Sequence, residues 1–109
     1  MLIESHDSHS YRIIRVEQEG EEDTDFGQIE DLVAKYVAEG MTKIAISLSI
    51  NAYPYSKLIS VLVRCDQLVK ERGGTLAVVQ SNKDFIEVLK RTKLDAVFRI
   101  AASEEELAG

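Results

Sequence analysis

Ser56 is a residue that could do chemistry, because it stands where a predicted strand passes into a predicted helix. Residues 43–49 alternate apolar with small or polar side chains, which predicts a strand, and residues 51–55, with Pro54, predict a turn. A long amphipathic helix is predicted from near Ser56 to the Gly73-Gly74 pair. Helix N-termini present N–H groups that favour negative charge. Two roles are open for the Ser56 hydroxyl: capping this helix, worth about 1 kcal/mol, and accepting a regulatory modification.

Ser56 lacks the partners that a hydrolytic serine needs. Such a serine requires a general base, and the histidines, His6 and His9, both lie within the first ten residues. The chain also has no Gly-x-Ser-x-Gly motif, so we expect no catalysis. His6, Asp7 and His9 carry metal-ligating atoms, but no second cluster with metal-ligand spacing accompanies them. We therefore expect neither a metal nor a cofactor.

Cys65 belongs to the apolar stripe of the long helix, which predicts a small core residue rather than a reactive thiol. The stripe consists of Leu58, Val61, Leu62, Cys65, Leu68 and Val69. Ile59 and Val63 lie off this stripe, among polar residues that include Ser60. A neighbouring helix would cover these two side chains in one interpretation. In the other, they form an exposed strip beside Ser56 that a partner covers.

Composition excludes several function classes. The chain has 109 residues, 45% of them hydrophobic and 29% charged, which predicts one globular domain, residues 1–109. A formal charge of -6 argues against nucleic acid or anionic lipid as the main partner. The longest apolar runs are too short for a membrane span, and the first residues do not have the pattern of a secretory signal. With one cysteine, these features lead us to expect a cytoplasmic protein.

Further elements follow from periodicity and from start and stop signals. Strands are predicted at residues 11–16, 75–79 and 96–100, and residues 1–10 are expected to form a short edge strand or a loose arm. The acidic run 17–25 predicts a turn, followed by a helix capped by Thr24 or Asp25 and ended by Gly40. Ser81 is predicted to cap a third helix, and a capping box at residues 103–106 predicts a short final one.

The predicted order of elements is β-β-α-β-α-β-α-β-α. Strands that alternate with helices imply parallel pairing with right-handed crossovers. The fold class is therefore α/β: a single domain with a mixed, largely parallel sheet of four to five strands covered by about four helices.

This order of elements resembles the STAS domain, named for sulfate transporters and anti-sigma factor antagonists. The resemblance covers essentially the whole chain and is strongest at residues 46–62, at the helix-to-strand junction 72–76 and at residues 89–98. In the antagonist branch, the turn before the second helix carries Asp-Ser-Ser-Gly, which aligns without gaps with residues 55–58 here. Ser56 keeps the acceptor position, whereas Tyr55, Lys57 and Leu58 depart from the pattern, and Ser47 stands where aspartate is frequent.

The resemblance implies a protein-binding regulatory domain. In the antagonist branch a partner kinase, which is also the anti-sigma factor, phosphorylates the serine that corresponds to Ser56. The expected partner-binding residues are Tyr53, Tyr55, Ser56, Lys57, Ile59, Ser60 and Val63. Tyr53 occupies a position where the family often has a core aromatic, so we expect it to be buried. Tyr55, beyond Pro54, is expected to be exposed as a contact residue.

Two alternatives to the partner switch remain open. The first is a STAS scaffold subunit of a larger stress-signalling or transporter-associated complex, without a phosphorylation cycle. The second is a small-molecule or nucleotide-binding module that uses the helix N-terminus at Ser56. The bulky side chains of Lys57 and Leu58 argue against the second, because they would block close approach of a phosphate to the backbone.

Overall fold

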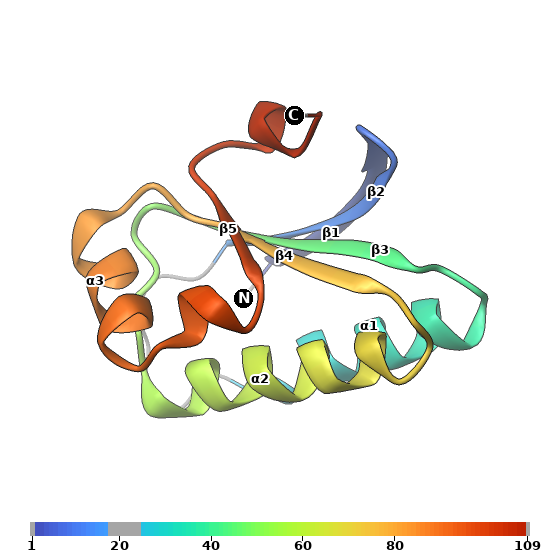
Figure 1. Cartoon of the computed structure of the whole chain (residues 1–109), viewed down its shortest axis with the longest axis horizontal. Helices are drawn as coiled ribbons and strands as arrows, with labels where there is room; N and C mark the ends of the chain where they lie inside the picture. The colour runs from blue at the N-terminus through green and yellow to red at the C-terminus, as the bar shows by residue number, and fades with distance from the viewer. Residues whose placement is uncertain (1, 18–24, 109) are drawn as a thin grey trace.

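Five strands form a single sheet in the computed structural model, which describes residues 2–17 and 25–108 (Figure 1). The strands are β1 (Leu2–Ser8), β2 (Tyr11–Glu17), β3 (Lys43–Leu48), β4 (Thr75–Val79) and β5 (Arg99–Ala101). They lie side by side in chain order. β1 is antiparallel to β2 and forms an edge, while all other neighbouring strands are parallel. The predicted mixed, largely parallel sheet is confirmed, including the edge strand at the N-terminus.

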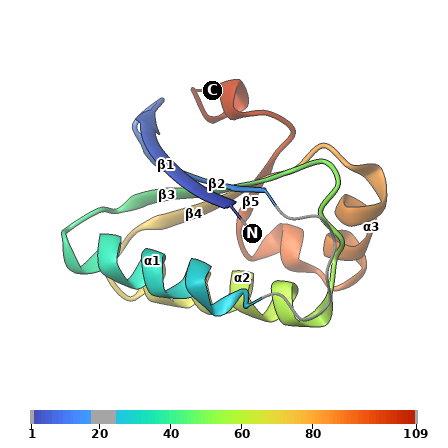
Figure 2. The ribbon, with the colours of Figure 1, turned by 180° about the vertical axis from the view of Figure 1, so that it is seen from behind.

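The helices lie mainly on one face of the sheet. They are α1 (Gly27–Ala38), α2 (Ser56–Lys70) and α3 (Lys83–Arg91), with two short 3₁₀ helices, η1 (Leu94–Ala96) and η2 (Glu104–Ala108). Figures 1 and 2 show α1 and α2 side by side beneath the sheet, with α3 at one end. η2 lies on the opposite face (Figure 1). No helix within the described ranges is long and apolar enough to cross a membrane.

The main core lies between the sheet and its helices, as predicted. Apolar residues of two strands and two helices are in one cluster: Ile44, Ile46 and Leu48 of β3, Leu76 and Val78 of β4, Leu62 and Cys65 of α2, and Leu89 of α3. Burial raises the pKa of the Cys65 thiol to about 12, so the reactive thiolate is scarce at neutral pH. The prediction that Cys65 is a packing residue is confirmed.

Two predictions for the C-terminal part of the chain differ from the structure. The last strand begins at Arg99, not Ala96, because Lys93 adopts a left-handed conformation with φ of 61° and residues 94–96 form η1. This turn directs the side chains of Leu94 and Phe98 into the core. The predicted capping box also differs, because the Glu106 carboxylate accepts the N–H of Ala102, at 3.2 Å, one residue before Ser103.

α1 begins close to its predicted start. Its first residue is Gly27, whose N–H donates to Asp25 Oδ1 at 3.0 Å, while Phe26 occupies the N-cap position without a side-chain cap. Asp25 thus satisfies one donor of the first turn, although it stands one residue before the cap. Thr24, the other predicted cap, and the acidic turn at residues 18–24 lie outside the described residues.

A second, smaller core lies on the face of the sheet that η2 covers. It consists of Tyr11, Ile13, Ala45, Ala77, Val79, Ala101 and Leu107. Beside it, the Glu104 carboxylate accepts two hydrogen bonds from Arg15, from Nε and Nη2, each at 2.8 Å. Together with a hydrogen bond from Ser47, Arg15 lowers the pKa of Glu104 to about 2.

This ion pair predicts a pH dependence of folding. The pKa of Glu104 is about 2 in the folded chain and 4.5 in its ordinary state, so its stabilising effect is fully present above pH 4.5. The effect is lost as the pH falls from 4.5 to 2. Because Arg15 is half exposed, we expect Glu104→Gln to cost about 1 kcal/mol at pH 7. Urea unfolding of both proteins from pH 7 to pH 2 measures this; a cost that persists at pH 2 would contradict it.

Candidate functional site

The N-terminus of α2 places Ser56 at the surface. The N-cap residue is Tyr55, whose extended backbone (φ -59°, ψ 146°) precedes the helix, and it makes no side-chain cap hydrogen bond. The first helical bond of this end runs from the Ile59 N–H to the Tyr55 carbonyl, at 3.0 Å. Ser56 is therefore the first residue of α2, and its predicted role as the N-cap is wrong. The Tyr55 side chain therefore does not cap the N–H groups of this first turn.

The predicted exposure of the two tyrosines of the turn is wrong for both residues: Tyr53, expected to be buried, is exposed, and Tyr55, expected to be exposed, is partly buried. Tyr53 is 58% exposed, whereas Tyr55 is partly buried and packs against the main core. The Tyr55 ring lies 6.3 Å from that of Phe26 and 4.6 Å from that of Tyr53, measured between centroids. Tyr55 turns inward because the N-cap position directs it toward the start of α1. Tyr53 thus becomes the exposed aromatic residue of the turn.

The remaining predicted contact residues differ in exposure. Ser56, Lys57 and Ser60 are exposed on the first two turns of α2. Ile59 and Val63 are half-buried and pack against the main core, so each still presents part of its side chain to solvent. Ile59 and Val63 are thus partly covered, as the first interpretation expects, and partly exposed beside Ser56, as the second expects.

Leu58 is buried and does not lie at the surface near the start of α2, where it was expected to block a phosphate. Its side chain is 1% exposed and belongs to the main core. It therefore does not stand in front of the N–H groups of the first turn, and the predicted blocking of a phosphate by Leu58 is wrong. Only Lys57, which is exposed, remains as a bulky side chain at this point.

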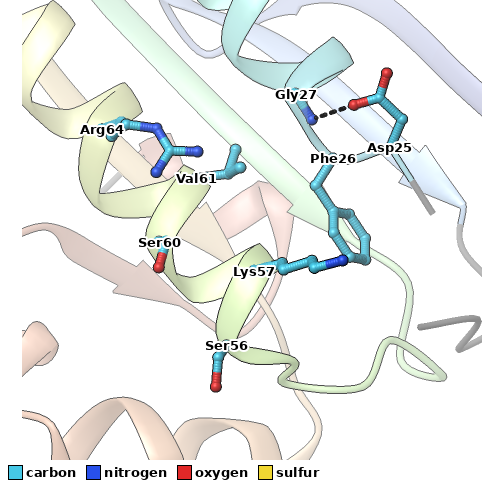
Figure 3. Close-up of a pocket in the computed structure, with 8 residues that line it drawn as sticks. All are labelled: Asp25, Phe26, Gly27, Ser56, Lys57, Ser60, Val61 and Arg64. Atoms are coloured by element: carbon cyan, nitrogen blue, oxygen red, sulfur yellow. Dashed lines mark hydrogen bonds between the residues drawn. The ribbon is translucent and has the colours of Figure 1, made fainter. Parts of the chain in front are cut away.

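A groove of about 600 Å³ runs between the start of α1 and the first half of α2. Figure 3 shows Lys57 and Arg64 extending from α2 toward α1, while the Ser56 and Ser60 hydroxyls point away from Phe26. Arg64 Nε donates to Glu30 Oε1 at 2.6 Å, which fixes it between the two helices. Within residues 2–17 and 25–108, Lys57 forms no ion pair. The Lys57 side chain thus lies toward α1, on a different side of the helix end from the Ser56 hydroxyl (Figure 3).

Gln80 and Asn82, which lie between β4 and α3, donate hydrogen bonds to the backbone of the turn before α2. Gln80 is 1% exposed, and its Nε2 donates to the Ser49 carbonyl at 3.1 Å. Its Oε1 accepts the N–H groups of Ser81 and Asn82, both at 2.9 Å. Asn82 Nδ2 donates to the Ile50 carbonyl at 2.9 Å. The β4–α3 turn thus fixes the backbone of residues 49–50, which lead into the site.

Sequence reasoning missed both of these positioning residues. Asn82, not Ser81, caps α3: its Oδ1 accepts the N–H groups of Asp84 at 2.9 Å and Phe85 at 3.1 Å. The two cap-forming residues are adjacent, so the local pattern leaves the choice open by one position. Gln80 gave no signal of its own except that it is a polar residue directly after a strand that is buried on both faces.

His6 and Asp7, two of the three N-terminal residues with metal-ligating atoms, have other contacts. His6 Nε2 lies 3.4 Å from Glu104 Oε1, and Asp7 forms an ion pair with Arg12. Within the described part of the chain, no group of three or more histidine, cysteine or acidic residues is arranged to hold a metal ion.

Comparison with known proteins agrees with this geometry. The model of the STAS domain family matches residues 11–107. Among solved structures, the NMR structure of the protein TM1081 is similar in fold, with a TM-score of 0.74 over 97% of this chain and 85% of that one, at 18% sequence identity. No curated protein matches the chain. Because the family match spans nearly the whole sequence, the chain belongs to the STAS domain family, whose members serve as protein-interaction and regulatory domains.

Proposed function

We propose that this chain is a partner-switching regulator that binds an anti-sigma factor with serine kinase activity. The contact surface consists of residues 53–63, and Ser56 is the residue that the partner phosphorylates. The observation that carries the proposal is the exposed hydroxyl of Ser56 at the first position of α2, in the place that the antagonist branch uses for its acceptor. Exposed Tyr53, Lys57 and Ser60 surround it and supply a mixed aromatic and polar contact surface.

A phosphate on Ser56 would be accommodated by the folded domain. It adds about -1.5 to -2 charges beside a helix N-terminus, which favours anions. The N-cap residue, Tyr55, makes no side-chain hydrogen bond to the N–H groups of this first turn, which are donors of the kind that bind anions. Modification therefore acts on the complex rather than on the fold. It introduces charge and a desolvation cost inside the contact surface, which lowers affinity for the partner.

Ser56 variants should separate capping from signalling. Because Ser56 follows the N-cap instead of occupying it, we expect Ser56→Ala to change stability by less than about 0.5 kcal/mol and to bind the partner normally. Ser56→Asp should also fold normally, since a carboxylate suits the first helical turn, and should bind more weakly. Gln67→Glu is the matched control, because it adds one negative charge to an exposed residue of α2 that lies outside the contact surface.

The test combines mass spectrometry with binding measurements. The chain is incubated with its cognate kinase and ATP, and the modified site is mapped by peptide sequencing. We expect phosphate on Ser56, none on the Ser56→Ala protein, and weaker binding by Ser56→Asp than by Gln67→Glu. If Ser56 stays unmodified and Ser56→Asp binds as tightly as the unsubstituted chain, the switch is absent.

That negative result would favour the scaffold alternative. Its supporting observation is the departure of Tyr55, Lys57 and Leu58 from the antagonist pattern. Tyr55 and Leu58 pack on or within the core, where they serve the fold rather than kinase recognition. A scaffold subunit would use the same exposed residues for a contact that no phosphate regulates.

A further inference from the structure

The C-terminal segment 103–108 covers the face of the sheet that lies opposite α1 and α2 (Figure 1). Leu107 is 4% exposed there and belongs to the second core. The side chains of the sheet beneath Leu107 are short. Ala45 of β3 and Ala77 of β4 are directly paired, and Ala101 adds a third small side chain on β5. Small residues on three adjacent strands leave a shallow apolar trough that one leucine fills.

Glu104 anchors the same segment across the sheet. Its carboxylate receives both hydrogen bonds of the Arg15 guanidinium from β2, a bidentate geometry that is selective for carboxylates. His6 of β1 lies 3.4 Å away, and Ser47 of β3 supplies a further hydrogen bond. Three strands therefore contribute polar groups to one carboxylate, next to the trough that holds Leu107.

The segment itself contributes little else. η2 is a 3₁₀ helix of five residues, and Leu107 is its one buried residue. Glu105, Glu106 and Ala108 are exposed. A further link, from Arg99 to the Glu106 carbonyl, joins it to the adjacent β5. So short a helix does not persist in water without its contacts. The segment is thus bound like a peptide ligand, through one carboxylate and one leucine three residues later.

We propose that residues 103–108 are a displaceable cover, and that the face beneath them binds a partner segment of the same chemistry. That partner presents a glutamate followed three residues later by a leucine within one helical turn. The glutamate pairs with Arg15 and His6, and the leucine enters the trough over Ala45 and Ala77. This surface lies on the opposite side of the sheet from α2 and is independent of Ser56 (Figure 1).

The test opens the cover in the 109-residue chain by charge reversal. Glu104→Arg places a second cation against Arg15, whereas Arg15→Glu combined with Glu104→Arg restores an ion pair of reversed polarity. Glu104→Gln is a milder opening variant. Glu105→Arg is the control, because it makes the same change in charge on the exposed neighbour. The probe is a fluorescent synthetic peptide with the sequence of residues 101–109, and binding is followed by anisotropy.

Two readouts are expected to agree. Amide exchange of Glu106, whose N–H donates to the Ser103 carbonyl, should accelerate roughly tenfold in Glu104→Arg and less in Glu104→Gln. It should stay unchanged in Glu105→Arg. The peptide should bind Glu104→Arg at least roughly tenfold more tightly than it binds the unsubstituted chain or the double variant. Replacing the peptide's leucine with serine should abolish that gain.

The proposal is overturned by either of two results. In the first, Glu106 exchanges equally slowly in all variants, so the cover does not open. In the second, Glu106 exchanges faster in Glu104→Arg, but the peptide binds all proteins alike, so the uncovered face is not a binding surface. Thermal unfolding checks that each variant is folded before the comparison.

Discussion

Leu62→Ala is expected to destabilise the domain by about 2–5 kcal/mol. The Leu62 side chain has no exposed surface and packs in the main core, between the α2 stripe and strands β3 and β4. Truncation removes apolar contacts on all sides and leaves a cavity that the surrounding strands cannot fill, because their backbones are fixed by the ladder. Small domains have total stabilities of about 5–15 kcal/mol, so this loss is a large part of the whole.

The measurement is urea unfolding of the variant, with Leu68→Ala as its control. Leu68 has the same side chain on the same helix, but it is half-buried, so its truncation should cost clearly less. Equal costs for the two variants, or near-normal stability of Leu62→Ala, would show that α2 presents a different face to the sheet.

The main core was predictable from the sequence because it depends on local periodicity. The stripe on α2 and the apolar runs of β3 and β4 each indicate which side chains face inward, and all of these side chains except Leu68, which is half-buried, are buried. The order of elements then determines a parallel sheet, because helices between strands require crossovers. Only Lys93 disturbs this agreement, since its left-handed backbone delays β5 until Arg99.

The candidate site was less predictable because its details depend on single positions. A shift of one residue in the start of α2 moves Ser56 from N-cap to first helical residue and turns Tyr55 inward in place of Tyr53. Helix boundaries in sequence patterns are rarely sharper than this. The strand-to-helix turn that carries Ser56 could nevertheless be located from Pro54 and the following apolar stripe.

Contacts between distant parts of the chain left no local signal at all. Arg15 and Glu104 are 89 residues apart, and neither stands in a motif that names the other. The second core is equally hidden, because the alanines beneath Leu107 are compatible with either face of a strand. These features follow from strand order and from the path of the C-terminus, which become known only in three dimensions.

Gln80→Ala is expected to cost about 2–4 kcal/mol and to loosen the turn that leads to Ser56. Gln80 is buried and makes three hydrogen bonds, so its truncation leaves the Ser49 carbonyl and the N–H groups of Ser81 and Asn82 without these partners. Buried polar groups that lose their partners cost about 1–3 kcal/mol each, and water entering the cavity offsets part of the total.

The effect on the turn is measurable separately from global stability. The Ala52 N–H donates to the Ser49 carbonyl at 3.0 Å, so its amide exchange reports on the segment that Gln80 holds. We expect this amide to exchange faster in Gln80→Ala than in Gln67→Ala, which truncates an exposed glutamine of α2. Partner affinity should fall in parallel, because binding must then order the turn. If exchange at Ala52 and stability both match the control, the β4–α3 turn does not position the site.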